Sequence, residues 1–243
     1  MLDDGYLDWD MIAPRIDELA HVTNLQVYLG VNDYDHLSRA RGILARTPAL
    51  RGLDLELANS DFLDDGDCCN GAIWLITNMF RSRNEVWQPV RLKSLRITSM
   101  CLLRVGRHLP EVLELNMLEH LQLVRCTDVN PFLQCLEPLG LNLSTLCIKD
   151  SDGTNTTDFA TDDFLRSLKA LKSLTSRFSD VENFDERTFL SHNSSLEFLG
   201  IEDILWAQAV LPPSKNEGSV ERLFVTVSVE SCDFTFVFFP IFH

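Results

Sequence analysis

The chain has 243 residues, of which 36 are acidic and 21 are lysine or arginine, so its formal net charge is −15. This charge argues against a general nucleic-acid binder, because neutralising phosphates requires a basic face. Hydrophobic residues make up 45% of the chain, which is enough for one sizeable core. We therefore predict a single α/β domain over residues 1–243.

Neither end of the sequence indicates a membrane protein. The acidic opening, MLDDGYLDWD, lacks the basic and apolar segments of a signal peptide. The longest apolar run, 234–242, is far shorter than the ~20 residues of a membrane-spanning helix. We expect no membrane contact and a cytoplasmic or nuclear location.

A helical cap is predicted over residues 1–20. Apolar side chains recur at helical spacing in DWDMIAPRIDELAHV, and the predicted helix runs from about Ile12 to Leu19. Its apolar side chains would cover the strand that follows, because the ends of stacked repeats otherwise expose apolar surface.

From residue 20 to residue 229, one short apolar template recurs along the chain. Apolar residues at its first, fourth and sixth positions are found at Val22-Leu25-Val27, Leu50-Leu53-Leu55, Leu92-Leu95-Ile97, Leu118-Leu121-Leu123, Leu143-Leu146-Ile148, Leu196-Leu199-Ile201 and Val220-Leu223-Val225, with a degenerate copy at Leu171-Leu174. Most copies are separated by about 20–29 residues, which is the period of one class of repeat protein and predicts about eight repeats. The alternation at the fourth and sixth positions predicts a short strand in each copy.

Helical apolar spacing predicts a helix in several intervals between these strands, at 36–50, 72–83, 102–109 and 162–174. Thr161 is the predicted N-cap of the last helix. One interval is much longer than the others, and its acidic stretch near 58–72 is interpreted as an insertion within a repeat. The apolar tail, 230–243, leaves two alternatives: an extra strand on the last repeat, or an incomplete terminus.

The stretch LEHLQLVRC (118–126) resembles the L-x-x-L-x-L-x-x-N/C core of leucine-rich repeat proteins, in the form with cysteine at the ninth position. LKSLRITSM and LSTLCIKDS are similar but carry Met100 and Ser151 there. Loose repeats of this kind look like the repeat region of F-box/leucine-rich-repeat adaptors of ubiquitin ligases of the fungal type, although the chain has no recognisable F-box. The resemblance implies a curved solenoid, with parallel strands on a concave face and helices and irregular turns on the convex face. Ubiquitin-ligase components would then be possible partners.

The common motifs of enzymes and metal sites are missing from the sequence. It contains no G-x-x-x-x-G-K-[ST], G-x-S-x-G, H-E-x-x-H or G-x-G-x-x-G stretch. A calcium-loop pattern starting at Asp61 has Leu63 and Ala72 where oxygen ligands are needed, so an acidic surface loop is the better interpretation. His120 has no second histidine close in sequence, which favours partner contact over catalysis or metal binding. We expect no enzyme, no cofactor and no metal.

The seven cysteines show no zinc-ligand spacing. Cys101, Cys126 and Cys147 lie in or beside predicted strands, where cysteine usually acts as a small, weakly polar core residue. We expect reduced thiols, in keeping with an intracellular protein.

The side chains between the leucines of each strand should point away from the core, because successive residues alternate. Thr98 is expected on this concave face. The candidate partner-binding residues there are Tyr28, Asp54, Glu56, Arg96, His120, Gln122, Lys149, Glu202 and Phe224. Aromatic and arginine side chains often anchor protein interfaces.

These residues predict a non-enzymatic interaction scaffold that binds a protein or peptide, not nucleic acid. Substrate recognition for a ubiquitin ligase is one form of that function. The alternatives are a stand-alone acidic regulator that binds a basic protein, and a truncated gene product with no independent function.

Overall fold

The computed structural model describes residues 20–30, 34–58, 72–73, 76–80, 89–149, 160–176, 192, 195–201, 222–229 and 232–238. The predicted N-terminal helix and most of the predicted insertion lie outside these residues.

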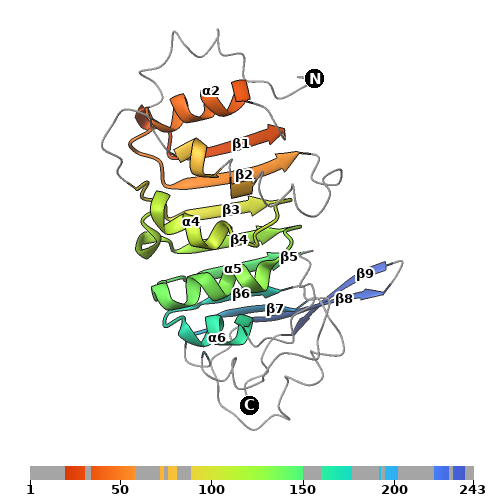
Figure 1. The fold of residues 1–243 in the computed structure, drawn as a ribbon. Coiled ribbons are helices and arrows are strands. Elements are labelled where there is room, and N and C mark those ends of the chain that lie inside the picture. Colours follow the sequence, from red (N-terminus) through yellow and green to blue (C-terminus); the bar gives the residue numbers. More distant parts are fainter. Residues whose placement is uncertain are drawn as a thin grey trace.

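The described residues form an α/β structure in which one sheet carries helices on one of its faces (Figure 1). Its strands follow one another in chain order: β1 (Asn24–Gly30), β2 (Gly52–Ala58), β3 (Ser94–Thr98), β4 (His120–Val124), β5 (Thr145–Lys149), β6 (Ser173–Ser176), β7 (Phe198–Ile201), β8 (Arg222–Val229) and β9 (Cys232–Phe238). Each strand from β1 to β7 pairs in parallel with the next one, whereas β9 is antiparallel to β8. Part of the apolar tail, Cys232–Phe238, thus lies as an extra strand beside β8.

The helices that cover the sheet are α2 (Tyr34–Leu44), α4 (Val105–Val112), α5 (Val129–Leu136) and α6 (Ala160–Ser167), with short 3-10 turns η3 (Leu115–Met117) and η4 (Glu137–Leu139). Residues 72–73 and 76–80 are also helical. Thr161 lies inside α6, which begins at Ala160, so its prediction as the N-cap is wrong. The last predicted helix also ends early, because residues 173–176 belong to β6.

The strand register aligns the fourth template position of every copy. The paired residues on successive strands are Leu25, Leu53, Leu95, Leu121, Leu146, Leu174, Leu199 and Leu223. From Leu53 to Leu199, these leucines are buried. Complete burial of one leucine side chain contributes about 1.5–3 kcal/mol, so this row is a major part of the core.

The same backbone hydrogen bonds recur between strands at the second template position. The carbonyl of Thr23 accepts hydrogen bonds from the N–H groups of Arg51 and Gly52. The carbonyls of Arg51, Lys93, Glu119, Ser144 and Lys172 each accept the corresponding pair of bonds from the next copy. Each copy therefore joins its neighbour in one fixed register.

The helices pack closely against one another on the covered face. A Cβ atom at Gly106 of α4 would lie 2.8 Å from Cys135 Cβ and 3.0 Å from the Phe132 carbonyl oxygen, both on α5. Phe132 itself is fully buried. Within the described ranges, each helix is too short or too polar to cross a bilayer.

The expectation of reduced thiols is wrong at one position. Cys101 is disulfide-bonded, whereas Cys126, Cys135 and Cys147 are reduced thiols. The cysteines therefore do not support the predicted intracellular location, because disulfides are typical of oxidising compartments.

Candidate partner-binding face

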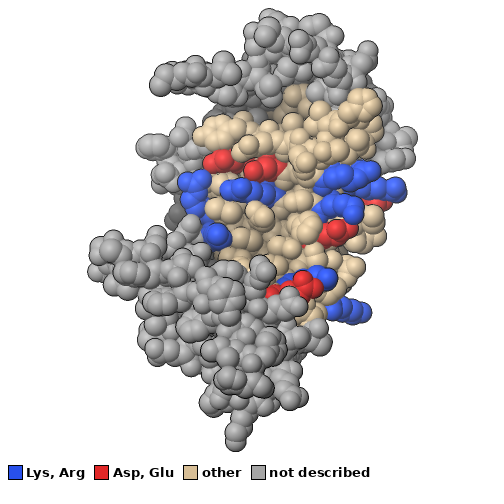
Figure 2. Space-filling model, turned by 180° about the vertical axis from the view of Figure 1, so that it is seen from behind, with Lys and Arg blue, Asp and Glu red and all other residues tan. Residues whose placement is uncertain are grey.

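The sheet face opposite the helices carries mostly polar side chains, and we call it the polar face. Its members are the described residues at the third, fifth and seventh template positions whose side chains are at least partly exposed: Asn24, Gln26, Tyr28, Asp54, Glu56, Ser94, Arg96, His120, Gln122, Val124, Thr145, Cys147, Lys149, Ser173, Thr175 and Phe198. In β4 and β5 these positions alternate strictly with buried ones. Figure 2 shows this side of the molecule, where acidic groups lie directly beside basic groups.

Thr98 is an exception to the predicted alternation. Its side chain is buried, and its hydroxyl has no hydrogen-bond partner among the described residues. It is the last residue of β3, and the extended backbone ends at the next residue, Ser99, which has a φ of 54°. Alternation requires extended backbone on both sides, so it does not hold at this position.

The register brings four of the predicted site residues together. Asp54 of β2 pairs with Arg96 of β3, which pairs with Gln122 of β4, while Glu56 lies two residues along β2 from Asp54. Gln26 of β1 extends the same row on the other side of Asp54. Since adjacent strands lie about 4.8 Å apart, the row Gln26–Asp54–Arg96–Gln122 forms a continuous polar strip across four strands.

The other candidates lie around this strip or outside the description. Tyr28 is exposed and is the register partner of Glu56, and His120 and Lys149 are partly exposed at opposite ends of their strands. Phe224 belongs to β8, where its backbone pairs with Gly200, but its side chain lies outside the described part of the structure. Glu202 also lies outside it.

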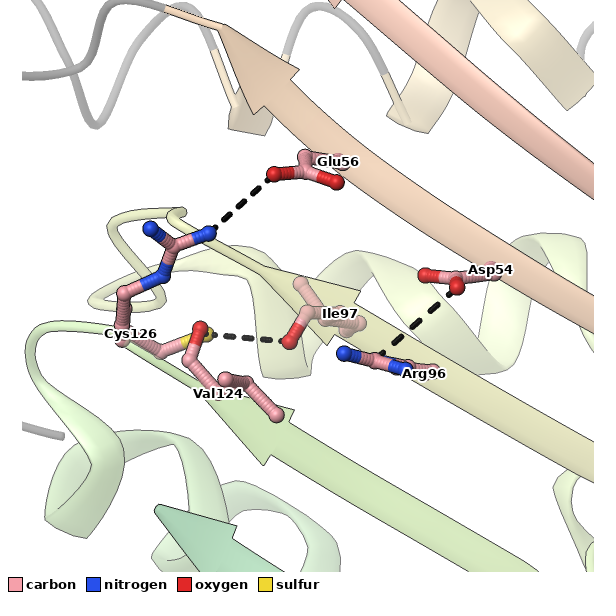
Figure 3. A network of polar contacts seen from close by, with 7 residues as sticks. Asp54, Glu56, Arg96, Ile97, Val124 and Cys126 are labelled. Atoms are coloured by element: carbon pink, nitrogen blue, oxygen red, sulfur yellow. Dashed lines mark hydrogen bonds and ion pairs between the residues drawn. The ribbon is translucent and has the colours of Figure 1, made fainter. Parts of the chain in front are cut away.

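One ion pair lies within the strip, and a second lies beside it (Figure 3). Arg96 Nε lies 3.8 Å from Asp54 Oδ2, which is an ion pair but too long for a hydrogen bond. Arg125 Nη2 donates a hydrogen bond of 3.2 Å to Glu56 Oε1. Sequence reasoning missed Arg125, because it follows β4 and adopts a left-handed φ of 52° that strand alternation does not describe.

The electrostatic environment of Asp54 is unusual for a surface carboxylate. Burial raises the pKa of Asp54 above its ordinary value of 3.8, and the neighbouring Glu56 raises it further, while Arg96 lowers it. The Oδ1 atom of Asp54 is buried without a hydrogen-bond partner among the described residues. The carboxylate has therefore lost water without gaining donors in exchange.

A shallow depression lies over this part of the strip. Its volume is about 350 Å³, and it is lined by Asn24, Leu25, Gln26, Gly52, Leu53, Asp54, Ser94, Arg96 and Gln122. Gly52 has no side chain, and the Asn24 amide occupies the position that a Cβ atom of residue 52 would take. The depression therefore offers a carboxylate, a guanidinium and side-chain amides within one recess.

Cys126 supports the end of the strand from the core side. Its thiol donates weak hydrogen bonds to the carbonyl oxygens of Ile97 at 3.4 Å and Val124 at 3.5 Å (Figure 3). Burial raises the pKa of Cys126 to about 11, against smaller opposing effects of backbone hydrogen bonds and Arg125. Because the thiolate is the reactive form of cysteine, this residue has a structural role and is a poor nucleophile.

The described residues contain no group of three or more His, Cys, Asp or Glu side chains that could hold a metal ion. On the described polar face, His120 is the single histidine. The arrangement is suited to recognition by hydrogen bonds and charges.

None of the comparisons, with protein-family models, with curated proteins or with solved structures, finds a match for this chain.

Proposed function

We propose that the chain is a non-enzymatic interaction scaffold that binds a protein or peptide partner through its polar face. The observation that carries this proposal is the polar strip, in which Asp54, Arg96 and Gln122 come from three adjacent strands and border one depression. Parallel strands in fixed register hold these side chains at regular intervals. Such an array can match complementary groups on an extended partner.

We also propose that the fold is a leucine-rich repeat solenoid of about eight repeats, with the polar face on its concave side. Two features support this assignment. The fourth template position is in register from Leu25 to Leu223, and the carbonyl at the second template position repeats its pair of hydrogen bonds at successive strands. Stacked repeats share one core in this way, and each contacts only its neighbours.

Recognition of substrates for a ubiquitin ligase is the more specific form of this function that we favour. Its support is the resemblance of LEHLQLVRC (118–126) to the repeats of such adaptors. The net charge of −15 instead favours a stand-alone binder of a basic protein. Co-purification with ligase core proteins distinguishes these two functions, because only an adaptor assembles with the ligase.

The test is quantitative affinity purification from cells with three versions of the full chain. One is the wild type, and the second carries Arg96→Glu and Lys149→Glu on the polar face. The third carries Arg104→Glu and Arg107→Glu, two exposed arginines at the start of α4, as a control with the same change in charge.

The proposal predicts a partner that the wild type and the α4 control capture equally, and that the polar-face variant captures at least about tenfold less. Equal capture by all three chains would remove the polar face as the binding surface. Loss of capture by both variants would show that net charge, and not the polar face, determines binding.

A further inference from the structure

The Asp54–Arg96 ion pair is open, although its carboxylate is more buried than that of a neighbouring closed pair. Lys93 and Glu119, which precede β3 and β4, form a hydrogen-bonded ion pair of 2.7 Å. In that pair the Glu119 side chain is 45% exposed, whereas the Asp54 side chain is 24% exposed. Arg96 Nε nevertheless stays 3.8 Å from Asp54 Oδ2. A carboxylate with less access to water would be expected to hold its cation more closely.

The side chains of Asp54 and Arg96 make no hydrogen bonds within the described part of the structure. Asp54 accepts none, and its Oδ1 atom is covered. Arg96 donates none, although its guanidinium group carries five N–H groups and its side chain is 45% exposed. The depression therefore contains an acceptor and a set of donors that are side by side and unused.

A guest that matches this pair has one donor and one acceptor close together and no net charge. A cationic guest would face Arg96, and an anionic guest would face Asp54, so either would be partly repelled. A side-chain carboxamide has an NH₂ donor and a carbonyl acceptor on one planar group. Because Asp54 is recessed, a group at the tip of a side chain can reach it more readily than a main-chain amide.

We propose that the depression binds the side-chain carboxamide of an asparagine or glutamine in the partner, whose NH₂ donates to Asp54 Oδ2 while its oxygen accepts from Arg96. This inference rests on the proposed function and adds the chemistry of the group that the polar face recognises. Gln26 and Gln122 on the flanking strands are uncharged, so the formal charges of Asp54 and Arg96 cancel over the strip as a whole.

The test uses four blocked amino acids as probes: the N-acetyl, C-methylamide forms of glutamine, lysine, glutamate and alanine. All four have the same main-chain amides, so alanine is the control for main-chain binding. Binding to the isotope-labelled full chain is followed by NMR through the backbone amides of Asp54 and Arg96 and the Nε–H signal of Arg96.

The proposal predicts that the glutamine probe shifts these signals in a saturable manner and binds at least about fivefold more tightly than the other three. A variant carrying Asp54→Ser and Arg96→Ser should lose this binding, and one carrying Lys93→Ser and Glu119→Ser should keep it. If the first variant fails to fold, the ranking of the four probes on the wild type remains a complete test.

A stronger response to the lysine or glutamate probe would overturn the inference in favour of a charged guest. An equal response to the alanine probe would overturn it in favour of the main chain, and no response to any probe would overturn it as well. Each result is independent of the affinity purification, in which the polar face can bind a partner whatever group enters the depression.

Discussion

Arg125 Nη2 lies 3.2 Å from Glu56 Oε1, although 69 residues separate them and β3 lies between their strands. The pair connects the second strand of the sheet to the turn after the fourth. Because the Arg125 side chain is 58% exposed, the contact is expected to be weak but measurable.

A double-mutant cycle with Glu56→Gln and Arg125→Gln should give a coupling free energy of about 0.2–1 kcal/mol, measured by urea unfolding. The coupling should decrease in ~1 M salt, which screens charges beyond ~3 Å. The Lys172–Glu197 pair, with both side chains about 60% exposed, is the control and should couple less. A cycle without coupling at low salt would contradict the contact.

Asp54→Asn should make the protein more stable at neutral pH. The pKa of Asp54 is raised above 3.8 in the folded state, mainly by burial, so folding favours the protonated form. The ionised carboxylate therefore weakens the fold as the pH rises above 3.8, and this effect is complete above the raised pKa. The gain in the free energy of unfolding should shrink as the pH falls and vanish below pH 3.8, where the wild-type carboxyl is protonated in both states.

Glu119→Gln is the control for Asp54→Asn, because it should change the free energy of unfolding in the opposite direction. The hydrogen bond and the charge of Lys93 lower the pKa of Glu119 below 4.5, so its ionised form stabilises the fold above that value. The substitution should weaken the fold at neutral pH, and the loss should disappear as the pH falls through the lowered pKa. If both substitutions changed stability in the same direction at neutral pH, the electrostatic description of Asp54 would be wrong.

Cys126 should resist alkylation in the folded protein. With a pKa of about 11 and a buried Sγ, its thiol is almost entirely protonated at neutral pH. Cys135 and Cys147 are reduced thiols that are only partly buried, so they should react first with iodoacetamide. Peptide mass spectrometry should detect modified Cys126 only after denaturant is added, and rapid modification of Cys126 in the native protein would contradict its burial.

Gly106→Ala should destabilise the protein even though alanine is the better helix former. The new Cβ would lie 2.8 Å from Cys135 Cβ and 3.0 Å from the Phe132 carbonyl oxygen, which would push α4 away from α5. Overpacking of this kind costs about 1–3 kcal/mol, more than the ~1 kcal/mol gained from helix propensity. Thermal or urea unfolding measures the change, with the exposed Gln134→Ala on α5 as the control. A more stable Gly106→Ala protein would contradict the close packing of these helices.

The alternation and period of the leucines predicted strands β1 to β8 and their register, whereas β9 contains no leucine and belongs to no copy of the template. Leu121 and Leu123 alternate within a repeat, so both the strand and its buried face follow from their spacing. The same alternation placed Asp54 and Arg96 on one face. Helix α5 (VNPFLQCL) was not among the predicted helices; its Pro131 lies in the first turn, where proline is tolerated.

Features beyond the ends of the strands could not be predicted from spacing. Arg125 reaches Glu56 because its own backbone adopts a left-handed conformation. This conformation is uncommon for residues other than glycine, and the sequence does not predict it here. Thr98 is buried for a related reason, since the backbone turns at Ser99 directly after it. Cys101 forms a disulfide, which residue spacing does not predict, because the bond requires two cysteines at a specific separation and orientation in space.

The side-by-side order of the strands underlies every assignment on the polar face, and methyl NOEs in a leucine-labelled sample test it most directly. We predict contacts between Leu95 and Leu121, between Leu121 and Leu146, and between Leu146 and Leu174, which are register partners on neighbouring strands. We predict none between Leu95 and Leu174, which are three strands, or about 14 Å, apart. A direct contact between Leu95 and Leu174, or no contact between Leu95 and Leu121, would contradict the account.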